Sequence, residues 1–408
     1  MDRLCKKEEC TGCLSCYNSC NINAIDIYTN EQGFNYPRIN ITKCIECGKC
    51  TKACPIINPP KQKESSLKTY ATWNKDYTIR KTSSSGGFFT IIATKILQEN
   101  GYVVGASFDK DFNVNHIIVD NINSLHKLRG SKYIQSNIGT TYKEITKLLK
   151  SGKKILFTGT PCQITGLKSY LHNKEYPNLY TIDLVCHGTP SPLIFQDYKK
   201  WLEKKYNSSI KDYQFRDKKW SWIRFNTKAT FANNTTYWGT WEEDIFMRGF
   251  LRDLYLRESC YNCHYTNLQR QGDITIADFW GYIPTQSEAD NKDTGISLVI
   301  INSDKGNELF ETCKKHMVWY KKDLEIAIKG NKALTQRVTI PNQRNSFWQT
   351  YFSKGFTATI PTFLYPDPIN LYNRTLYKYG KYSFRLKLVS VYIKIKSQLR
   401  RIKKQIFK

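Results

Sequence analysis

Residues 10–20 read CTGCLSCYNSC and residues 44–54 read CIECGKCTKAC. Both stretches have the spacing C-x2-C-x2-C-x3-C, and the second repeats the first 34 residues further on, which is typical of a duplicated module. Three closely spaced thiolates can bind three corners of a four-iron cluster, while the fourth cysteine of each run binds the other cluster. The spacing therefore predicts two 4Fe-4S clusters, with Cys10, Cys13, Cys16 and Cys54 as the ligands of one and Cys44, Cys47, Cys50 and Cys20 as the ligands of the other.

Structural zinc is the alternative for these motifs, but zinc sites usually have two separated C-x2-C pairs and no third cysteine two residues later. Pro55 follows the second run, as in ferredoxins, whereas Asn21 stands where the first run would have its proline. That difference affects a turn and no ligand. Six cysteines lie outside these two motifs, and of these we expect Cys5 to be a bystander surface thiol and Cys313 to be a packing residue.

The length of 408 residues suggests two or three domains, and a hydrophobic content of 40% is enough to bury a core. A disordered tail protein is therefore excluded. No apolar run approaches the roughly 18 residues that cross a bilayer, and the start of the chain is rich in cysteine. We expect no spanning helix and no signal peptide, a cytoplasmic location, and cysteines that bind metal rather than form disulfides.

The chain is strongly basic, with 62 Lys and Arg against 35 Asp and Glu and a net charge of +27. Residues 371–408 hold twelve of the basic residues and no acidic residue, and the rest of the excess is spread along the chain, as on a solvated surface. Because no nucleic-acid-binding motif accompanies this charge, nucleic acid is not an expected partner.

The basic tail, residues 371–408, has an apolar stripe at alternating spacings of four and three residues, which predicts an amphipathic helix. The stripe consists of Leu388, Tyr392, Ile395, Leu399, Ile402 and Ile406. Such a helix is expected to lie on an anionic membrane, which would make the protein peripheral at the inner membrane face, or on a partner. The alternative is a helix that packs on its own body.

The chain divides at a polar, proline-interrupted linker, residues 59–68. Residues 1–58 are the predicted two-cluster ferredoxin domain, and the core follows in two parts, 69–150 and 151–370. Strands are predicted at 69–73, 101–108, 114–119, 154–158, 179–185, 273–279 and 297–302, antiparallel strands within 213–241, and helices at 87–99, around 148 and at 167–171. This order contains βαβ units, so the predicted fold class is α+β or mixed α/β.

Four later cysteines form a second set: Cys162 and Cys186, each just after a predicted strand, and the pair Cys260 and Cys263. Strand ends in open α/β sheets are where functional sites collect. Two single cysteines and one C-x2-C pair can bind either a third 4Fe-4S cluster or a zinc ion, and the spacing leaves both open.

Two short stretches have the small and basic residues of an anion site. Residues 83–87, SSSGG, lie between a strand and an apolar helix, where backbone N–H groups and the helix dipole favour phosphate. Residues 129–136, RGSKYIQS, offer cationic and hydroxyl donors suited to a pyrophosphate. The alternatives are an ordinary helix N-cap and a basic turn, and neither stretch matches the standard nicotinamide or nucleoside-triphosphate fingerprints.

Several motifs in the core occur together in an order that resembles the coenzyme F420 hydrogenase/dehydrogenase beta subunit family. They are SSGG at 84–87, RGSKY at 129–133, GTPCQ at 159–163, CHG at 186–188, the Cys260 and Cys263 pair, and D-x4-DFWG at 273–281. The resemblance extends over residues 69–310. With its N-terminal ferredoxin domain, the chain is similar to bacterial members found with polysaccharide-synthesis genes and to the F420-oxidising subunits of archaeal electron-transport complexes.

The resemblance implies a flavoprotein in which FAD lies near a 4Fe-4S cluster and exchanges hydride with a second ring system. The cluster ligands it implies are Cys162, Cys186, Cys260 and Cys263, and the residues it places along the FAD are Ser85, Gly86, Gly87, Lys132, Thr160 and Gln163. His187 and Asp278 are candidate proton handlers, because reduced flavin or substrate must be protonated. The alternative for His187 is a hydrogen bond to a cluster sulfur or to the backbone.

The predicted function is that of an iron–sulfur flavoprotein oxidoreductase. Electrons would pass between the ferredoxin-type clusters, a third 4Fe-4S cluster and FAD, with hydride exchange to a coenzyme F420-like substrate or a polysaccharide-pathway intermediate. FAD can connect single-electron and hydride chemistry, which explains why both cofactor types should occur in one chain. The expected partner is a redox protein or a small-molecule hydride donor or acceptor. The alternative is an electron-transfer subunit that serves a protein partner and has no small-molecule substrate of its own.

Overall fold

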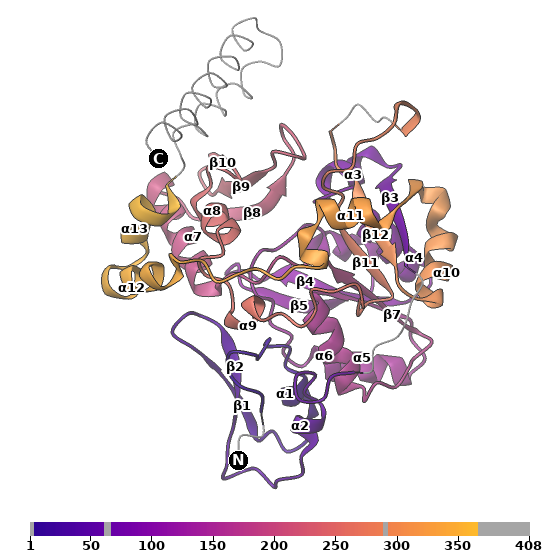
Figure 1. Ribbon diagram of the computed structural model, residues 1–408, viewed down its shortest axis with the longest axis horizontal. Helices are drawn as coiled ribbons and strands as arrows, with labels where there is room; N and C mark the ends of the chain where they lie inside the picture. Colours follow the sequence, from indigo (N-terminus) through magenta and orange to yellow (C-terminus); the bar gives the residue numbers. More distant parts are fainter. Residues whose placement is uncertain (1–3, 61–66, 289–292, 366–408) are drawn as a thin grey trace, which may run out of the picture.

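The computed structural model describes residues 4–60, 67–288 and 293–365. A small N-terminal domain lies beneath a larger core, which consists of an eight-stranded sheet with its helices and a second, smaller lobe (Figure 1). The predicted tail at 371–408, with its apolar stripe, lies outside the described residues. Within the described ranges, no helix combines the length and hydropathy that crossing a bilayer requires.

The N-terminal domain is a structural repeat as well as a sequence repeat. It contains the hairpin β1 (Ile25–Thr29) and β2 (Asn35–Ile39) and the short helices α1 (Ser15–Ser19) and α2 (Lys49–Lys52). Each helix begins inside a cysteine motif, and the residue before it, Leu14 or Gly48, has left-handed backbone with φ of 59° or 71°. Two residues earlier, Gly12 and Glu46 also have positive φ, at 69° and 59°. The 34-residue repeat therefore keeps its backbone turns even where the side chains differ.

The large sheet is mixed, in the order β13-β3-β12-β11-β7-β6-β4-β5. Its strands are β3 (Lys68–Asn74), β4 (Tyr102–Phe108), β5 (Val114–Val119), β6 (Ile155–Gly159), β7 (Leu179–Leu184), β11 (Ile274–Asp278), β12 (Ser297–Ile301) and β13 (Met317–Lys322). Strands β4, β6, β7 and β11 are parallel, and the strands that flank them pair antiparallel. The predicted mixed α/β class is confirmed, and the predicted strands match within a few residues.

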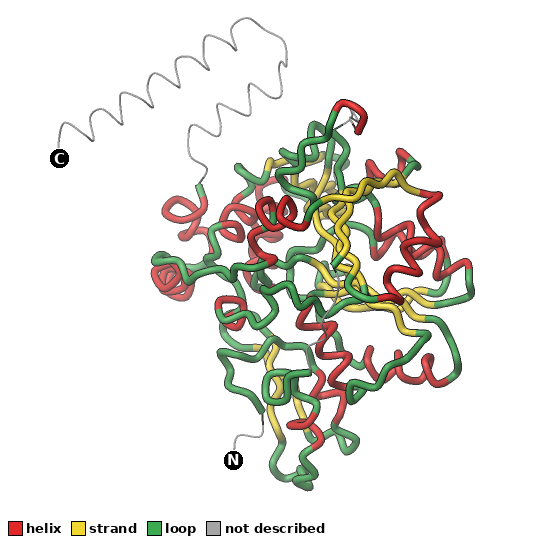
Figure 2. Tube along the Cα trace, turned by 45° about the vertical axis from the view of Figure 1, so that its right-hand side comes forward, coloured by secondary structure: helices red, strands yellow, loops and turns green. Residues whose placement is uncertain are grey.

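Buried side chains alternate across the sheet, as the two-residue period of a strand requires. On β12, Val299 and Ile301 join the apolar cluster of one face, while Leu298 and Ile300 join the cluster of the other. The first face is covered by α4 (Phe88–Gln98) and α10 (Asp304–Cys313), and the other face by α5 (Thr141–Lys150), α6 (Pro161–Tyr170) and α11 (Leu324–Gly330). The sheet is therefore the middle layer of the core (Figure 2).

The second lobe is built on a three-stranded antiparallel sheet, as predicted for 213–241. The strands are β8 (Ile210–Asp217), β9 (Asn226–Phe231) and β10 (Thr236–Thr240). The helices of this region are α7 (Pro192–Tyr206), α8 (Ile245–Leu251), α9 (Glu258–Tyr261), α12 (Arg344–Lys354) and α13 (Phe356–Thr359), while α3 (Tyr77–Thr82) leads into the 83–87 loop. Its interior is aromatic, with Phe195, Phe215 and Phe246 nearly inaccessible to solvent.

The N-terminal domain packs on the core through its first cysteine motif. Leu14 is buried in the apolar cluster formed by α5 and α6. Gly166 of α6 lies so close to Cys13 that a Cβ on the glycine would be 2.7 Å from the cysteine Cβ. At the other end of the domain, the hairpin turn at Gly33 packs on Leu193 at the start of α7. The second motif, by contrast, has an exposed Cys47 and no heavy atom within 4 Å of a Cβ built on Gly48.

Candidate redox site

Three neighbouring parallel strands bring the predicted core site together at one edge of the sheet. Cys162 follows β6 at the first turn of α6, Cys186 follows β7, and Asp278 is the last residue of β11. Because β6, β7 and β11 are adjacent and parallel, their carboxyl ends meet at the same edge. The prediction that Cys162 and Cys186 stand at neighbouring strand ends is confirmed, and Asp278 joins them at the end of β11.

The four core cysteines form one group of interacting thiols. Burial raises the pKa of Cys162 to about 12 and that of Cys260 to about 11, and it raises the pKa values of Cys186 and Cys263 as well; each group also acts on its neighbours. Backbone N–H groups reach the sulfurs, from Thr189 to Cys260 at 3.3 Å and from Tyr265 to Cys263 at 3.4 Å. Hydrogen bonds of this kind surround cluster sulfurs and tune their reduction potential, so this set fits an iron–sulfur cluster.

The zinc alternative for this set stays open. Within the described parts of the chain, no three His, Cys, Asp or Glu side chains are arranged closely enough to hold a single metal ion. Metal analysis has to decide between the two metals.

Cys10, Cys13, Cys16 and Cys54 lie together, in the combination that the spacing predicts for one cluster, while the predicted set of Cys44, Cys47, Cys50 and Cys20 stays a prediction. Buried Cys13 and Cys16 interact with Cys10 and Cys54, and burial raises the pKa of both buried thiols. One expectation is wrong: Cys5 is a neighbour of this group, because its thiol hydrogen-bonds with Cys10 and Cys54, and these contacts raise its own pKa. The N-terminal segment folds back onto the cluster motif, which spacing could not predict.

The first motif and the core cysteines are neighbours. Cys13 and Cys162 act on each other electrostatically, and Cys13 packs against Gly166, one turn beyond Cys162 on α6. The first motif therefore lies next to the core set.

A cavity of about 680 Å³ opens beside the core cysteines. Cys162 and Cys186 contribute to its wall, and so do most of the predicted site residues, namely Ser85, Gly87, Lys132, Thr160, Gln163, His187 and Asp278. The volume is typical of a pocket for one cofactor-sized ligand. The structure therefore brings together residues of five motifs, from Ser85 to Asp278, which lie 193 residues apart in the sequence.

Gly86 has a different place from the other predicted contacts. Its N–H donates to the Ser297 hydroxyl at 2.9 Å, and a Cβ on Gly86 would be 2.4 Å from the carbonyl oxygen of Thr72. Only glycine fits this close approach to β3 and β12. Gly86 thus packs the loop onto the sheet, and a direct contact with a cofactor stays a prediction.

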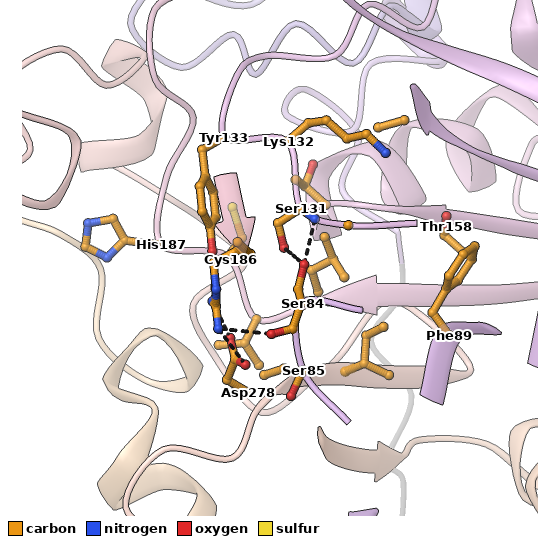
Figure 3. Close-up of a pocket in the computed structure, with 18 of the residues that line it drawn as sticks. Ser84, Ser85, Phe89, Ser131, Lys132, Tyr133, Thr158, Cys186, His187 and Asp278 are labelled. Atoms are coloured by element: carbon orange, nitrogen blue, oxygen red, sulfur yellow. Dashed lines mark hydrogen bonds and ion pairs between the residues drawn. The ribbon is translucent and has the colours of Figure 1, made fainter. Parts of the chain in front are cut away.

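The two predicted anion loops hold each other. The backbone N–H of Ser131 donates to the Ser84 hydroxyl at 2.8 Å, and the two hydroxyls are 3.0 Å apart (Figure 3). Next to them, the Lys132 ammonium donates to the carbonyl groups of Lys127 and Arg129 at 2.9 and 3.1 Å. Burial lowers the pKa of Lys132 to about 7. At neutral pH, the Lys132 side chain is therefore only partly protonated.

Asp278 is held by a residue that the sequence did not single out. Arg216 donates to both of its carboxylate oxygens, at 2.7 and 3.0 Å, and the Trp222 indole donates at 2.6 Å. Burial alone would lower the pKa of Arg216, but the facing carboxylate outweighs that effect and raises it. Proton handling by Asp278 stays a prediction, while these contacts favour an anchoring role for its carboxylate. A single arginine without a motif gave no signal in the sequence.

His187 is oriented by a second carboxylate that the sequence did not reveal. Its Nε2 lies 2.7 Å from Asp253 Oδ1, and its ring meets Phe250 edge to face. This hydrogen bond goes to a side chain rather than to a sulfur or the backbone. His187 lies apart from the contact between Ser84 and Ser131 (Figure 3).

The cavity fits an anionic cofactor with hydrogen-bonding groups. Helix α4 begins at Gly87 without a side-chain cap, so the N–H groups of its first turn are not taken by such a cap. Two buried polar atoms of cavity residues, Thr11 Oγ1 and Arg216 Nε, have no hydrogen-bond partner among the described residues. Buried polar groups normally have partners, so these atoms are suited to meet a ligand. Thr11 brings the N-terminal domain into the wall of the cavity.

Comparisons with known proteins agree with these features. Residues 152–326 match the family model for the C terminus of the coenzyme F420 hydrogenase/dehydrogenase beta subunit, and residues 9–56 match the 4Fe-4S dicluster domain. A solved structure of the F420-reducing NiFe hydrogenase complex from Methanosarcina barkeri contains a similar chain, with 17% identity, coverage of 71% of this chain and 93% of that chain, and a TM-score of 0.46. The comparison with curated proteins found no match. The chain is thus an iron–sulfur protein in which residues 9–56 match a 4Fe-4S dicluster domain and residues 152–326 are similar to the C terminus of the coenzyme F420 hydrogenase/dehydrogenase beta subunit.

Proposed function

We propose that this chain is an iron–sulfur flavoprotein oxidoreductase with FAD in the 680 Å³ cavity and a third 4Fe-4S cluster on the four core cysteines. One observation carries the proposal: Cys162 and Cys186 share the cavity wall with both predicted anion loops. When bound, FAD would exchange hydride with a substrate and single electrons with iron–sulfur clusters.

Different residues of the chain would bind different parts of the FAD. The first turn of α4, Lys132 and Arg129 would hold the phosphates, because they combine N–H groups with positive charge at one end of the cavity. Thr160 and Gln163, which form a capping box at the start of α6, would lie along the cofactor next to Cys162. The Asp278 carboxylate fixes the Arg216 guanidinium, whose Nε is left to meet the ligand.

His187 is the better candidate for holding a proton. If the Asp253 carboxylate accepts the Nε2–H of the neutral ring, Nδ1 is the nitrogen that can take up a further proton.

The substrate that exchanges hydride is proposed to be acidic. The cavity wall includes Arg129, Lys132 and Arg216, so an anionic group would gain from entering it. A coenzyme F420-like molecule and an acidic polysaccharide-pathway intermediate are the two candidates.

A protein partner would exchange electrons at the second cysteine motif. Cys47 is exposed there, and Ile41 and Ile45 are 84% and 68% exposed. Lys43, Lys49 and Lys52 are exposed in the same segment of the chain, which suits a small acidic redox protein.

Anaerobic reconstitution followed by iron, sulfide, zinc and flavin analysis tests the proposal. We expect about twelve iron atoms and one FAD per chain, because three cubanes contain four irons each. Replacing both Cys260 and Cys263 with serine should remove about four irons and stop flavin reduction. The matched control is Cys313→Ser, since Cys313 is buried in α10, outside the predicted cluster groups.

Two results would contradict the proposal. Eight irons with one zinc would make the core set a zinc site. If the reconstituted protein takes up no flavin, the cavity binds a ligand other than FAD. Turnover of a small acceptor by the isolated chain supports an enzyme, whereas turnover only with a second protein supports the relay-subunit alternative.

A further inference from the structure

Arg257 is a buried cation at the junction of the N-terminal domain and the core. Its side chain is among the largest fully buried ones, and the residue is 1% exposed. It immediately precedes α9, the short helix that carries Cys260. No motif in the sequence pointed to it.

The guanidinium of Arg257 crosses to the N-terminal domain. Its Nε donates to the carbonyl oxygen of Cys10 at 2.7 Å, and both of its terminal nitrogens donate to the carbonyl oxygen of Asn35 at 3.1 Å. The group also stacks on the Tyr36 ring, 4.0 Å from the ring centroid. One core side chain thus holds the first cysteine motif and the hairpin of the N-terminal domain together.

The same guanidinium reaches the cavity wall. It donates to Gln135 Oε1 at 2.9 Å, and Gln135 lines the cavity together with Thr11. Gly12 leaves the room for this contact: a Cβ there would be 2.5 Å from the Gln135 amide nitrogen and 3.0 Å from the guanidinium carbon. The first motif, the core cysteines and the cavity therefore meet at Arg257.

Among the described residues, none of these contacts of Arg257 is with a carboxylate. The oxygen atoms that accept hydrogen bonds from its side chain are all neutral: two backbone carbonyl oxygens, of Cys10 and Asn35, and the amide oxygen of Gln135. Buried charges are normally paired, because removing an isolated ion from water is costly. The neighbouring groups that would carry negative charge once they bind a cluster are cysteine sulfurs: Arg257 Nε donates to the carbonyl oxygen of Cys10 at 2.7 Å, and the carbonyl oxygen of Arg257 accepts from the N–H of Cys260 at 2.9 Å.

We propose that Arg257 is a positioning residue that fixes the first cysteine motif against the core cysteine set and supplies a fixed positive charge that favours the reduced state of both. The part that concerns the core set rests on the proposed third cluster. When one electron moves from the first-motif cluster to the core cluster, the first-motif cluster is oxidised by one electron and the core cluster is reduced by one electron. Total charge is unchanged, so one buried cation beside both sites stabilises the electron on either side.

Redox titration of the holoprotein, followed by electron paramagnetic resonance, tests the charge. In Arg257→Gln, the first-motif cluster and the core cluster should both become harder to reduce. We expect at least a tenfold change in the reduction equilibrium, which is about 59 mV for one electron. Arg257→Lys keeps the charge and should keep the potentials much closer to those of the unchanged protein.

Limited proteolysis without added cofactors tests the positioning. Both Arg257 variants should release the N-terminal domain faster, because lysine cannot make the forked contact to Asn35 and Gln135. The matched control is Arg344→Gln. Arg344 is also a buried arginine that reaches this domain, through Gln32 Oε1 at 3.1 Å, but its other contacts are Leu254 and Tyr261 rather than a cysteine. It should loosen the domain without shifting a potential.

Unchanged potentials in Arg257→Gln, or an equal shift in Arg344→Gln, would overturn the proposal. If Arg257→Gln does not fold, Arg257→Lys still tests the proposal. Because the lysine variant keeps the charge, a fall in its reduction potentials as large as the one expected for Arg257→Gln would overturn the proposal too. Failure of the proposed third cluster is recognised separately, since eight irons would then be found in the unchanged protein. In that case the shift of the first-motif cluster still tests Arg257.

Discussion

The two cysteine motifs have the same spacing and the same backbone turns, but they lie in opposite surroundings. In the first motif, Leu14 is buried against α5 and α6, and Gly12 touches Arg257 and Gln135. In the second, their equivalents are Gly48, whose Cβ would meet nothing within 4 Å, and an exposed Glu46. Residues 12 and 46 both have positive φ, yet only one of them has to be glycine for lack of space.

This difference separates what the motif spacing determines from what the surroundings determine. Spacing and left-handed turns bring thiols together, so both motifs can form a cluster site. The neighbouring residues decide burial, local charge and access, and these set reduction potential and choice of partner. In the proposed function, the first motif would therefore exchange electrons inside the chain and the second would exchange them with other proteins.

Serine replacement of one cysteine in each motif should show the largest difference. Cys13→Ser and Cys47→Ser should each lose about four irons, because each removes one ligand of a cubane. Only Cys13→Ser should also loosen the domain contact, since Cys13 is buried and packs on Gly166. Iron analysis and thermal unfolding measure the two effects. Equal losses of unfolding temperature in both variants would show that the two surroundings are energetically alike.

The sequence predicted the parts of this site that depend on local spacing. The grouping of Cys10, Cys13, Cys16 and Cys54 follows from a periodic motif, and the meeting of Cys162 and Cys186 follows from parallel strand ends. The first pattern is contained in a short stretch of sequence, and the second needs only a general rule of sheet topology.

The residues that sequence reasoning missed are single charges with distant partners. Arg257 bonds to Cys10 across 247 residues, Arg216 pairs with Asp278 across 62, and His187 with Asp253 across 66. No spacing rule connects such pairs. The family resemblance places Gly86 along the cofactor, whereas its nearest neighbours are atoms of two strands, β3 and β12. A motif match cannot show which side of a loop faces the cavity.

A pair of glycine variants tests the steric part of the comparison. Replacing Gly12 or Gly48 with alanine should lower the free energy of unfolding by a similar amount, about 1–2 kcal/mol, through the backbone alone, because φ is 69° at one position and 71° at the other. Gly12→Ala should lose a further ~1–3 kcal/mol, since its Cβ would overlap Gln135 and crowd Arg257. Denaturant unfolding of both variants measures the difference. If Gly48→Ala is as unstable as Gly12→Ala, the contact with Arg257 contributes nothing.

The affinity of the core cavity for an anionic ligand should change with pH around neutrality. Burial lowers the pKa of Lys132 to about 7, so the cavity holds an ammonium at pH 6 and mostly a neutral amine at pH 8. Affinity for FAD, or for ADP as an anionic probe, should therefore fall by about tenfold from pH 6 to pH 8. Lys132→Arg should bind without this dependence, because arginine keeps its charge. Calorimetric titration measures both, and a flat profile in the unchanged protein would remove Lys132 from the anion site.

Surface charge beside the second motif should have the smallest effect and should act only on exchange with a partner. Ile45→Asp adds a negative charge among Lys43, Lys49 and Cys47, where an acidic redox protein would approach. We expect a few-fold slower reduction by a small acidic ferredoxin, with a weaker salt dependence, because rim charges act mainly on association. Ile283→Asp is the matched control, since Ile283 is 86% exposed on the core and follows β11. Iron and flavin contents should not change in either variant. If both slow the ferredoxin equally, net charge rather than the second motif governs the encounter, and if neither does, the partner docks elsewhere.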